Sequence, residues 1–117
     1  MNDIETALRI IQIGTGFTMM YFGVSQMIKP RPWSEQYSPQ WMKNFLGSAE
    51  LPFMRLHGVG NFVLGALFAL NIYPEIVAWI VLGWWLSILP FTIRHSTHIA
   101  ARDVSIIASI IAVLILL

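Results

Sequence analysis

The stretch that decides the fold is residues 53–72, FMRLHGVGNFVLGALFALNI. Its second half is apolar on every face of a helix, and such a helix needs either lipid or a large core around it. Because a chain of 117 residues offers no core of that size, we interpret the stretch as a transmembrane helix. Its polar side chains, Arg55, His57 and Asn61, then need partners inside a helical bundle, which makes them the first candidates for a functional site.

The composition of the whole chain agrees with a membrane location. Hydrophobic residues form 56% of the chain and charged residues 11%, against roughly 25% charged residues in soluble domains. The net charge of +1 and the scattered basic residues give no reason to expect nucleic acid as a partner. The absence of cysteine excludes disulfides, thiolate nucleophiles and iron–sulfur clusters.

Three further stretches are long and apolar enough to be interpreted as transmembrane helices. The predicted fold class is therefore all-α: an integral membrane four-helix bundle, forming a single domain over residues 1–117. We expect a short interfacial helix between the first and second spans. The four spans are predicted at residues 6–28, 51–72, 74–93 and 98–117.

Glycines mark the faces on which these helices should meet. Gly16 and Gly23, seven residues apart, share a face of the first span, and small residues let membrane helices approach backbone to backbone. We interpret the glycines of the second span in the same way, and we expect Gln12 and Gln26 to form hydrogen bonds between helices. The second-span glycines are Gly58, Gly60 and Gly65.

The first connection is rich in proline and aromatic residues. Residues 29–32, KPRP, should end the first span, and Ser38 with Pro39 should begin the short helix that Gly47 ends. Trp41 and Phe45 share a face of this helix and predict an anchor at the lipid headgroups, with a lid over the bundle as the alternative.

Basic residues predict the topology. All but Arg9 of the seven lysines and arginines fall near the first and third connections. The positive-inside rule then makes those connections cytoplasmic and leaves both termini outside a multi-pass protein of the cell membrane.

This topology places one set of polar residues at a single membrane face. The second helix starts there, the third ends there and the fourth starts there, so we expect one polar pocket. Its predicted members are Arg55, His57, Asn61, Arg94, His95, His98, Arg102 and Asp103.

The pocket allows several kinds of chemistry. His57, His95 and His98 suit a metal ion or haem, whereas His57 and Asn61 could instead hold quinone or another small amphiphile by hydrogen bonds. A purely structural role for the histidines is the further alternative. The sequence requires no particular cofactor, and it contains no nucleophile motif that would define a catalytic residue.

The last span carries two adjacent residues of opposite charge. Arg102 and Asp103 are adjacent, so their side chains project about 100° apart on a helix and should pair with other helices. We expect Arg55 or Arg94 to pair with Asp103, and Glu50 to pair with Arg102.

Several short motifs resemble the DoxX-like small membrane proteins. They are Tyr21-Phe22-Gly23 and Lys29-Pro30 in and after the first span, residues 60–70 in the second, and Ala101-Arg102-Asp103 in the last. The chain departs from that pattern at Asn61, where the family often has glutamate, and in its long first connection. The resemblance implies an accessory membrane protein, similar to the small subunit of a thiosulfate:quinone oxidoreductase.

Three functions follow as hypotheses. The first is a DoxX-like accessory membrane protein linked to quinone or membrane redox chemistry, and the second is a metal- or haem-binding membrane protein. The third is a small oligomeric transporter with Arg55, Asn61 and Asp103 along its path. Lipid is the expected partner in all three, together with a second copy of the chain or another membrane subunit.

Overall fold

The computed structural model describes residues 2–117, which form helices and no strand. The elements are Asp3–Ile28 (α1), Pro30–Tyr37 (α2), Gln40–Leu46 (α3), the 3₁₀ turn Gly47–Ala49 (η1), Glu50–Ala69 (α4), Pro74–His95 (α5) and Thr97–Leu116 (α6). The all-α prediction is confirmed.

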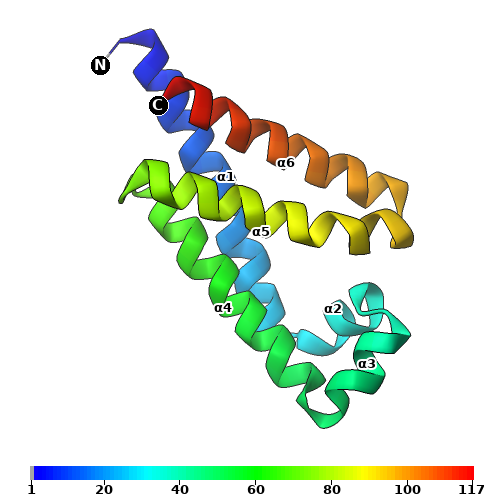
Figure 1. Cartoon of the computed structure of the whole chain (residues 1–117). Coiled ribbons are helices and arrows are strands. Elements are labelled where there is room, and N and C mark those ends of the chain that lie inside the picture. Colours follow the sequence, from blue (N-terminus) through cyan, green and yellow to red (C-terminus); the bar gives the residue numbers. More distant parts are fainter. Residues whose placement is uncertain (1) are drawn as a thin grey trace.

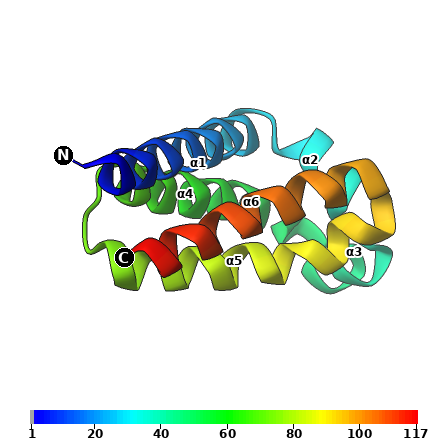
Figure 2. The ribbon, with the colours of Figure 1, turned by 90° about the horizontal axis from the view of Figure 1, so that it is seen from above.

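The four long helices form two antiparallel pairs. The most extensive contact joins α1 to α4, and the next joins α5 to α6 (Figure 1). The pairs lie against each other near the chain termini, and they diverge toward α2 and α3, which fill the space at the opposite end (Figures 1 and 2). The two helical pairs are therefore in contact at one end of the molecule, the closed end, and separated at the other, the divided end.

The α1–α4 contact depends on paired glycines. Gly16 lies against Gly65, and Gly23 lies against Gly58. A Cβ atom built on Gly23 would lie 2.5 Å from the carbonyl oxygen of Gly58, closer than any real side chain comes to backbone. The backbones thus meet without side chains between them, which confirms the predicted packing role of these glycines.

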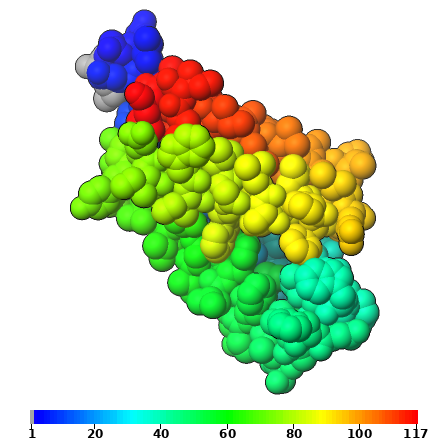
Figure 3. All heavy atoms as spheres, viewed as in Figure 1, coloured from blue at the N-terminus to red at the C-terminus, as the bar shows by residue number. Residues whose placement is uncertain are grey.

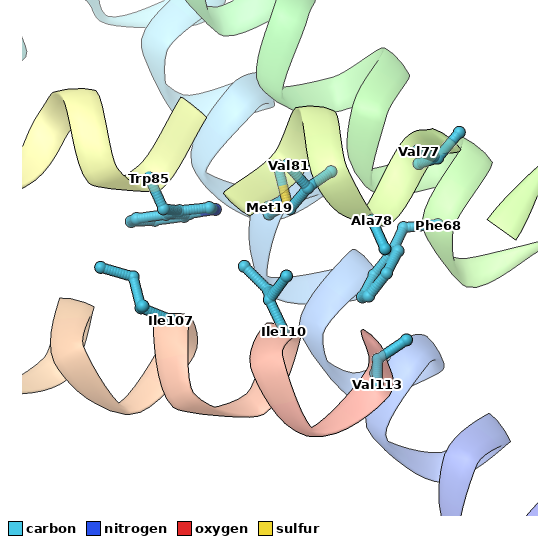
Figure 4. Packing of buried hydrophobic residues seen from close by; sticks show 9 residues of the cluster. All are labelled: Met19, Phe68, Val77, Ala78, Val81, Trp85, Ile107, Ile110 and Val113. Carbon is cyan, nitrogen blue, oxygen red and sulfur yellow. The ribbon is translucent and has the colours of Figure 1, made fainter. Parts of the chain in front are cut away.

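The hydrophobic core lies toward the closed end. Nine buried side chains from all four long helices interlock there (Figure 4), namely Met19, Phe68, Val77, Ala78, Val81, Trp85, Ile107, Ile110 and Val113. Trp85 is the member nearest the divided end, and its ring also contributes to the cavity described below.

Polar contacts join α1 to the end of α4. The guanidinium of Arg9 donates to the carbonyl oxygen of Ala69 at 3.1 Å, and the amide of Gln12 donates to Asn71 Oδ1 at 2.9 Å. Carbonyls at a helix end have no partner within the helix, so the cation satisfies one of them. The hydrogen bond predicted for Gln12 is thus formed, with a residue of the turn after α4 as its partner.

Three segments are long and apolar enough to cross a membrane: Gln40–Ala69, Pro74–His95 and Thr97–Leu116. Helix α1 is not among them, although it covers the predicted first span. Its composition is less apolar because it carries Gln12, Thr15 and Gln26, which are buried inside the protein. Three of the four predicted spans thus coincide with helices whose length and composition would allow them to cross a membrane.

The first connection holds two short helices instead of the single one predicted. Residues 30–32 begin α2 where we expected only a break, because proline is accommodated in the first turn of a helix, where its missing N–H has no partner to lose. Trp41 and Phe45 are exposed on α3. Ser96 caps α6, accepting a hydrogen bond from the N–H of Ile99.

Candidate functional site

A cavity of about 230 Å³ lies where the two helical pairs diverge. The surface is hollowed where α5 faces α4 and the α2–α3 segment (Figure 3). Much of the lining is apolar and aromatic, including Phe22, Trp33, Met42, Phe53, Ile88 and Phe91. Polar groups lie among them, including Gln26, Tyr37, His57, Asn61, Thr92 and Arg102.

Helical periodicity explains why these side chains share one space. On α4 the lining residues Met54, His57 and Asn61 follow one another at intervals of three and four, so they stand on one face. That face is directed toward α1 and α5, because Gly58 beside it meets α1 and Gly60 meets the ring of Trp84. The cavity is thus built by regular helices, with α2 and α3 supplying one wall.

A hydrogen-bonded network joins three helices on the α4 side of the cavity. The indole N–H of Trp84 donates to Asn61 Oδ1 at 2.7 Å, and Asn61 Nδ2 donates to Gln26 Oε1 at 2.6 Å. Gln26 Nε2 in turn lies 3.2 Å from Nδ1 of His57. We call this the amide network, and it consists of Trp84, Asn61, Gln26 and His57.

The amide network is buried and tightly packed. Gln26 and Asn61 are 5% and 3% exposed, and the ring of His57 stacks on that of Trp84 with centroids 4.6 Å apart. Hydrogen bonds in such a dry environment are electrostatically stronger than in water, and an unmade one is correspondingly costly. The network therefore holds the His57 ring in one orientation at the cavity wall.

A second polar group lies where α6 reaches the cavity. The Arg102 guanidinium pairs with Asp103 Oδ1 at 2.8 Å and lies over the Phe22 ring, 4.7 Å from its centroid. Burial raises the pKa of Tyr37 above its usual value, while the charge of the nearby Arg102 opposes that effect. Tyr37 therefore stays a neutral phenol at physiological pH.

The predicted partners of the charged residues were wrong. Arg102 and Asp103 pair with each other, because the long arginine side chain folds back along the helix, where it is supported by Phe22. Asp103 is fully buried, and its Oδ2 has no hydrogen-bond partner within residues 2–117. Glu50 instead accepts a hydrogen bond from Ser34.

The structure brings together only part of the predicted pocket. His57, Asn61 and Arg102 line the cavity, and Asp103 lies buried beside Arg102. The remaining four predicted members, Arg55, Arg94, His95 and His98, are exposed and do not line it.

The three histidines are not gathered around one point. His95 contacts the edge of the Tyr37 ring, and His98 is exposed on α6, whereas His57 lies inside the cavity. Within residues 2–117 no three histidine, aspartate or glutamate side chains are placed to hold a metal ion. The geometry thus offers His57 as a hydrogen-bonding group of the cavity wall.

The hydrogen bonds between helices predicted for Gln26 are confirmed, but the sequence did not indicate that Gln26, Tyr37 and Trp33 line a cavity or that Trp84 bonds to its wall. A glutamine three residues after Gly23 in a largely apolar helix was the available signal for Gln26. The tryptophans gave no signal of a place at the cavity, because indole rings in a membrane protein serve equally well as interfacial anchors, core residues or hydrogen-bond donors.

Comparison of the chain with family models, with characterised proteins and with solved structures finds no match.

Proposed function

We propose that this chain is a four-helix integral membrane protein of the DoxX-like kind, which binds the head group of a quinone in the cavity between its helical pairs. The observation that carries the proposal is the cavity itself, an apolar and aromatic space that also contains polar groups from α2, α4 and α6. That combination is typical of sites for flat, largely apolar ligands.

The size of the cavity favours a single ring. At about 230 Å³ it lies below the roughly 300–1,000 Å³ of sites that enclose a whole drug-sized ligand. A benzoquinone ring with an isoprenoid tail fits this description if the ring enters the cavity and the tail stays in lipid. Phe53 and Ser87 belong to the lining and are exposed, so the cavity reaches the surface of the protein.

The polar groups suit the two carbonyl oxygens of a quinone. His57 on α4 offers a ring nitrogen, while Arg102 on α6 and Tyr37 on α2 offer N–H and O–H groups from other elements. Donors on separate helices can reach opposite ends of one ring, as the two carbonyls require.

The exposed surface of α1 supports a fourth membrane crossing. Its polar residues Gln12, Thr15 and Gln26 are buried, while its exposed side chains are largely apolar. The large apolar ones are Ile4, Ile10, Ile13, Phe17, Tyr21, Val24 and Ile28. A helix that turns its polar residues inward in this way presents hydrocarbon to lipid despite its modest overall hydropathy. In this proposal the termini lie outside, the α2–α3 segment is cytoplasmic, and the chain assists a partner membrane subunit.

The test is quinone binding by the purified protein in detergent. A short-tail benzoquinone should quench tryptophan fluorescence saturably, because Trp33 and Trp85 line the cavity. His57→Phe keeps a ring against Trp84 but removes the polar contact, and we expect about tenfold weaker binding.

His98→Phe is the matched control, since His98 is an exposed histidine outside the cavity. It should bind the quinone as the unmodified protein does. Absence of saturable quenching, or equal affinities in the two histidine variants, would overturn the proposal.

A further inference from the structure

The amide network has only one consistent direction. An indole N–H donates and never accepts, so Trp84 requires the oxygen of Asn61 to face it. Asn61 must then present its NH₂ group to Gln26, which accepts with its own oxygen. Turning either amide over would place two donors or two acceptors in contact inside a buried region.

This direction continues to the histidine. With its oxygen used, Gln26 can offer only its NH₂ group to His57 Nδ1, and the second amide hydrogen points to the sulfur of Met54 at 3.5 Å. Nδ1 therefore accepts and carries no proton. The proton of the neutral ring sits on Nε2, and a proton on Nδ1 would face the NH₂ group of Gln26.

We infer that Trp84, acting through Asn61 and Gln26, fixes His57 as an Nε2–H donor and thereby makes the cavity selective for a head group that accepts a hydrogen bond, the oxidised quinone over its quinol. This inference rests on the proposed function. His57 is the residue that touches the ligand, and Trp84 is a positioning residue that lies outside the cavity lining.

Selectivity follows from what each ligand brings to the donor. A quinone carbonyl oxygen only accepts, which matches an N–H group. A quinol hydroxyl carries a hydrogen that also needs an acceptor, and Nδ1 of His57 is already occupied by Gln26. An unpaired polar hydrogen in a largely apolar site is costly, so sites of this kind discriminate strongly.

The first experiment reads the tautomer directly and needs no ligand. Magnetic resonance of isotope-labelled histidine nitrogens in the purified protein should show one ring with a bare Nδ1 and a protonated Nε2. Loss of that signal in His57→Phe assigns it among the three histidines. A protonated Nδ1 on His57 would overturn the inference.

The second experiment compares ligands and variants. The unmodified protein should bind a short-tail benzoquinone about tenfold more tightly than the corresponding quinol. Trp84→Phe keeps the aromatic stack on His57 but lacks the N–H, so the tautomer should become mixed and the affinity ratio should fall toward one. Trp79→Phe, at a position 60% exposed on the same helix, should leave both readouts unchanged.

The outcomes separate the two proposals. If neither quinone nor quinol binds, the proposed function falls, whatever the tautomer. If both bind with equal affinity, or if Trp84→Phe changes neither the tautomer nor the ratio, quinone binding stands and the inference on selectivity is wrong.

Discussion

At the scale of single residues, the site is governed by which polar groups are paired and which are left alone. Asn61 and Gln26 satisfy each other across helices, whereas one oxygen of Asp103 is buried with no hydrogen-bond partner in the described chain. The buried negative charge of Asp103 is compensated by the guanidinium of Arg102.

Arg102→Leu is therefore expected to destabilise the protein. The Asp103 carboxylate would be left buried without its cation, and we expect a loss on the order of 2–3 kcal/mol, below the value for a fully enclosed pair because the Arg102 side chain is 38% exposed. Denaturant unfolding in detergent measures it. Combining Arg102→Leu with Asp103→Leu should recover most of the loss, and a double variant as unstable as the single one would contradict this explanation.

Tyr37 predicts an alkaline dependence of stability. Burial raises the pKa of its phenol, so the folded state holds this proton more tightly than the unfolded state does. The stabilisation is present in full below about pH 10 and is lost as the pH rises through the raised pKa. Above that pH the free energy of unfolding should fall less steeply with pH in Tyr37→Phe than in the unmodified protein. Identical pH profiles of the two proteins would refute this role of Tyr37.

At the scale of elements, the α1–α4 contact is the most constrained part of the fold. Gly23→Ala places a methyl group against the carbonyl oxygen of Gly58 and the backbone of Phe62. We expect it to cost about 1–3 kcal/mol, because a backbone contact cannot yield as a flexible side chain can. Thermal unfolding followed by circular dichroism is a suitable measurement.

Gly14→Ala is the matched control on the same helix. Nothing lies within 4 Å of an added methyl group there, and alanine favours a helix over glycine by about 1 kcal/mol. It should be neutral or stabilising. Equal losses at the two positions would contradict the explanation that the contact with α4 causes the loss in Gly23→Ala.

The elements also show how far sequence reasoning reaches. The glycine faces and the short connection between the second and third spans are local signals, and both are seen in the structure. The pairing of Arg102 with Asp103 was missed because spacing on a helix gives the direction of Cβ and not the path of a long side chain. The predicted pocket also included Arg55, Arg94, His95 and His98, which lie outside the cavity. The sequence indicates how deep along its helix each residue lies, but not that the two helical pairs diverge at that end.

At the scale of the whole molecule, the proposed topology has a direct test. The chain contains no cysteine, so single cysteines report position without background. With four crossings, Asp3→Cys should react with an impermeant maleimide added outside intact cells, and Gln36→Cys in α2 should react only after the membrane is opened. Both positions are exposed. Labelling of both from the same side would mean that α1 does not cross, and the reverse pattern would invert the orientation.

The interlocked side chains lie toward one end of the molecule, while the other end is divided around a hollow. Solvent deuterium should therefore enter the amides around Ser38 and Met42 long before those around Val81 and Ile110, because few apolar contacts resist local opening there. The wall that α2 and α3 form is thus also the part of the cavity that opens most readily, so a guest molecule can be admitted without rearrangement of the packed core.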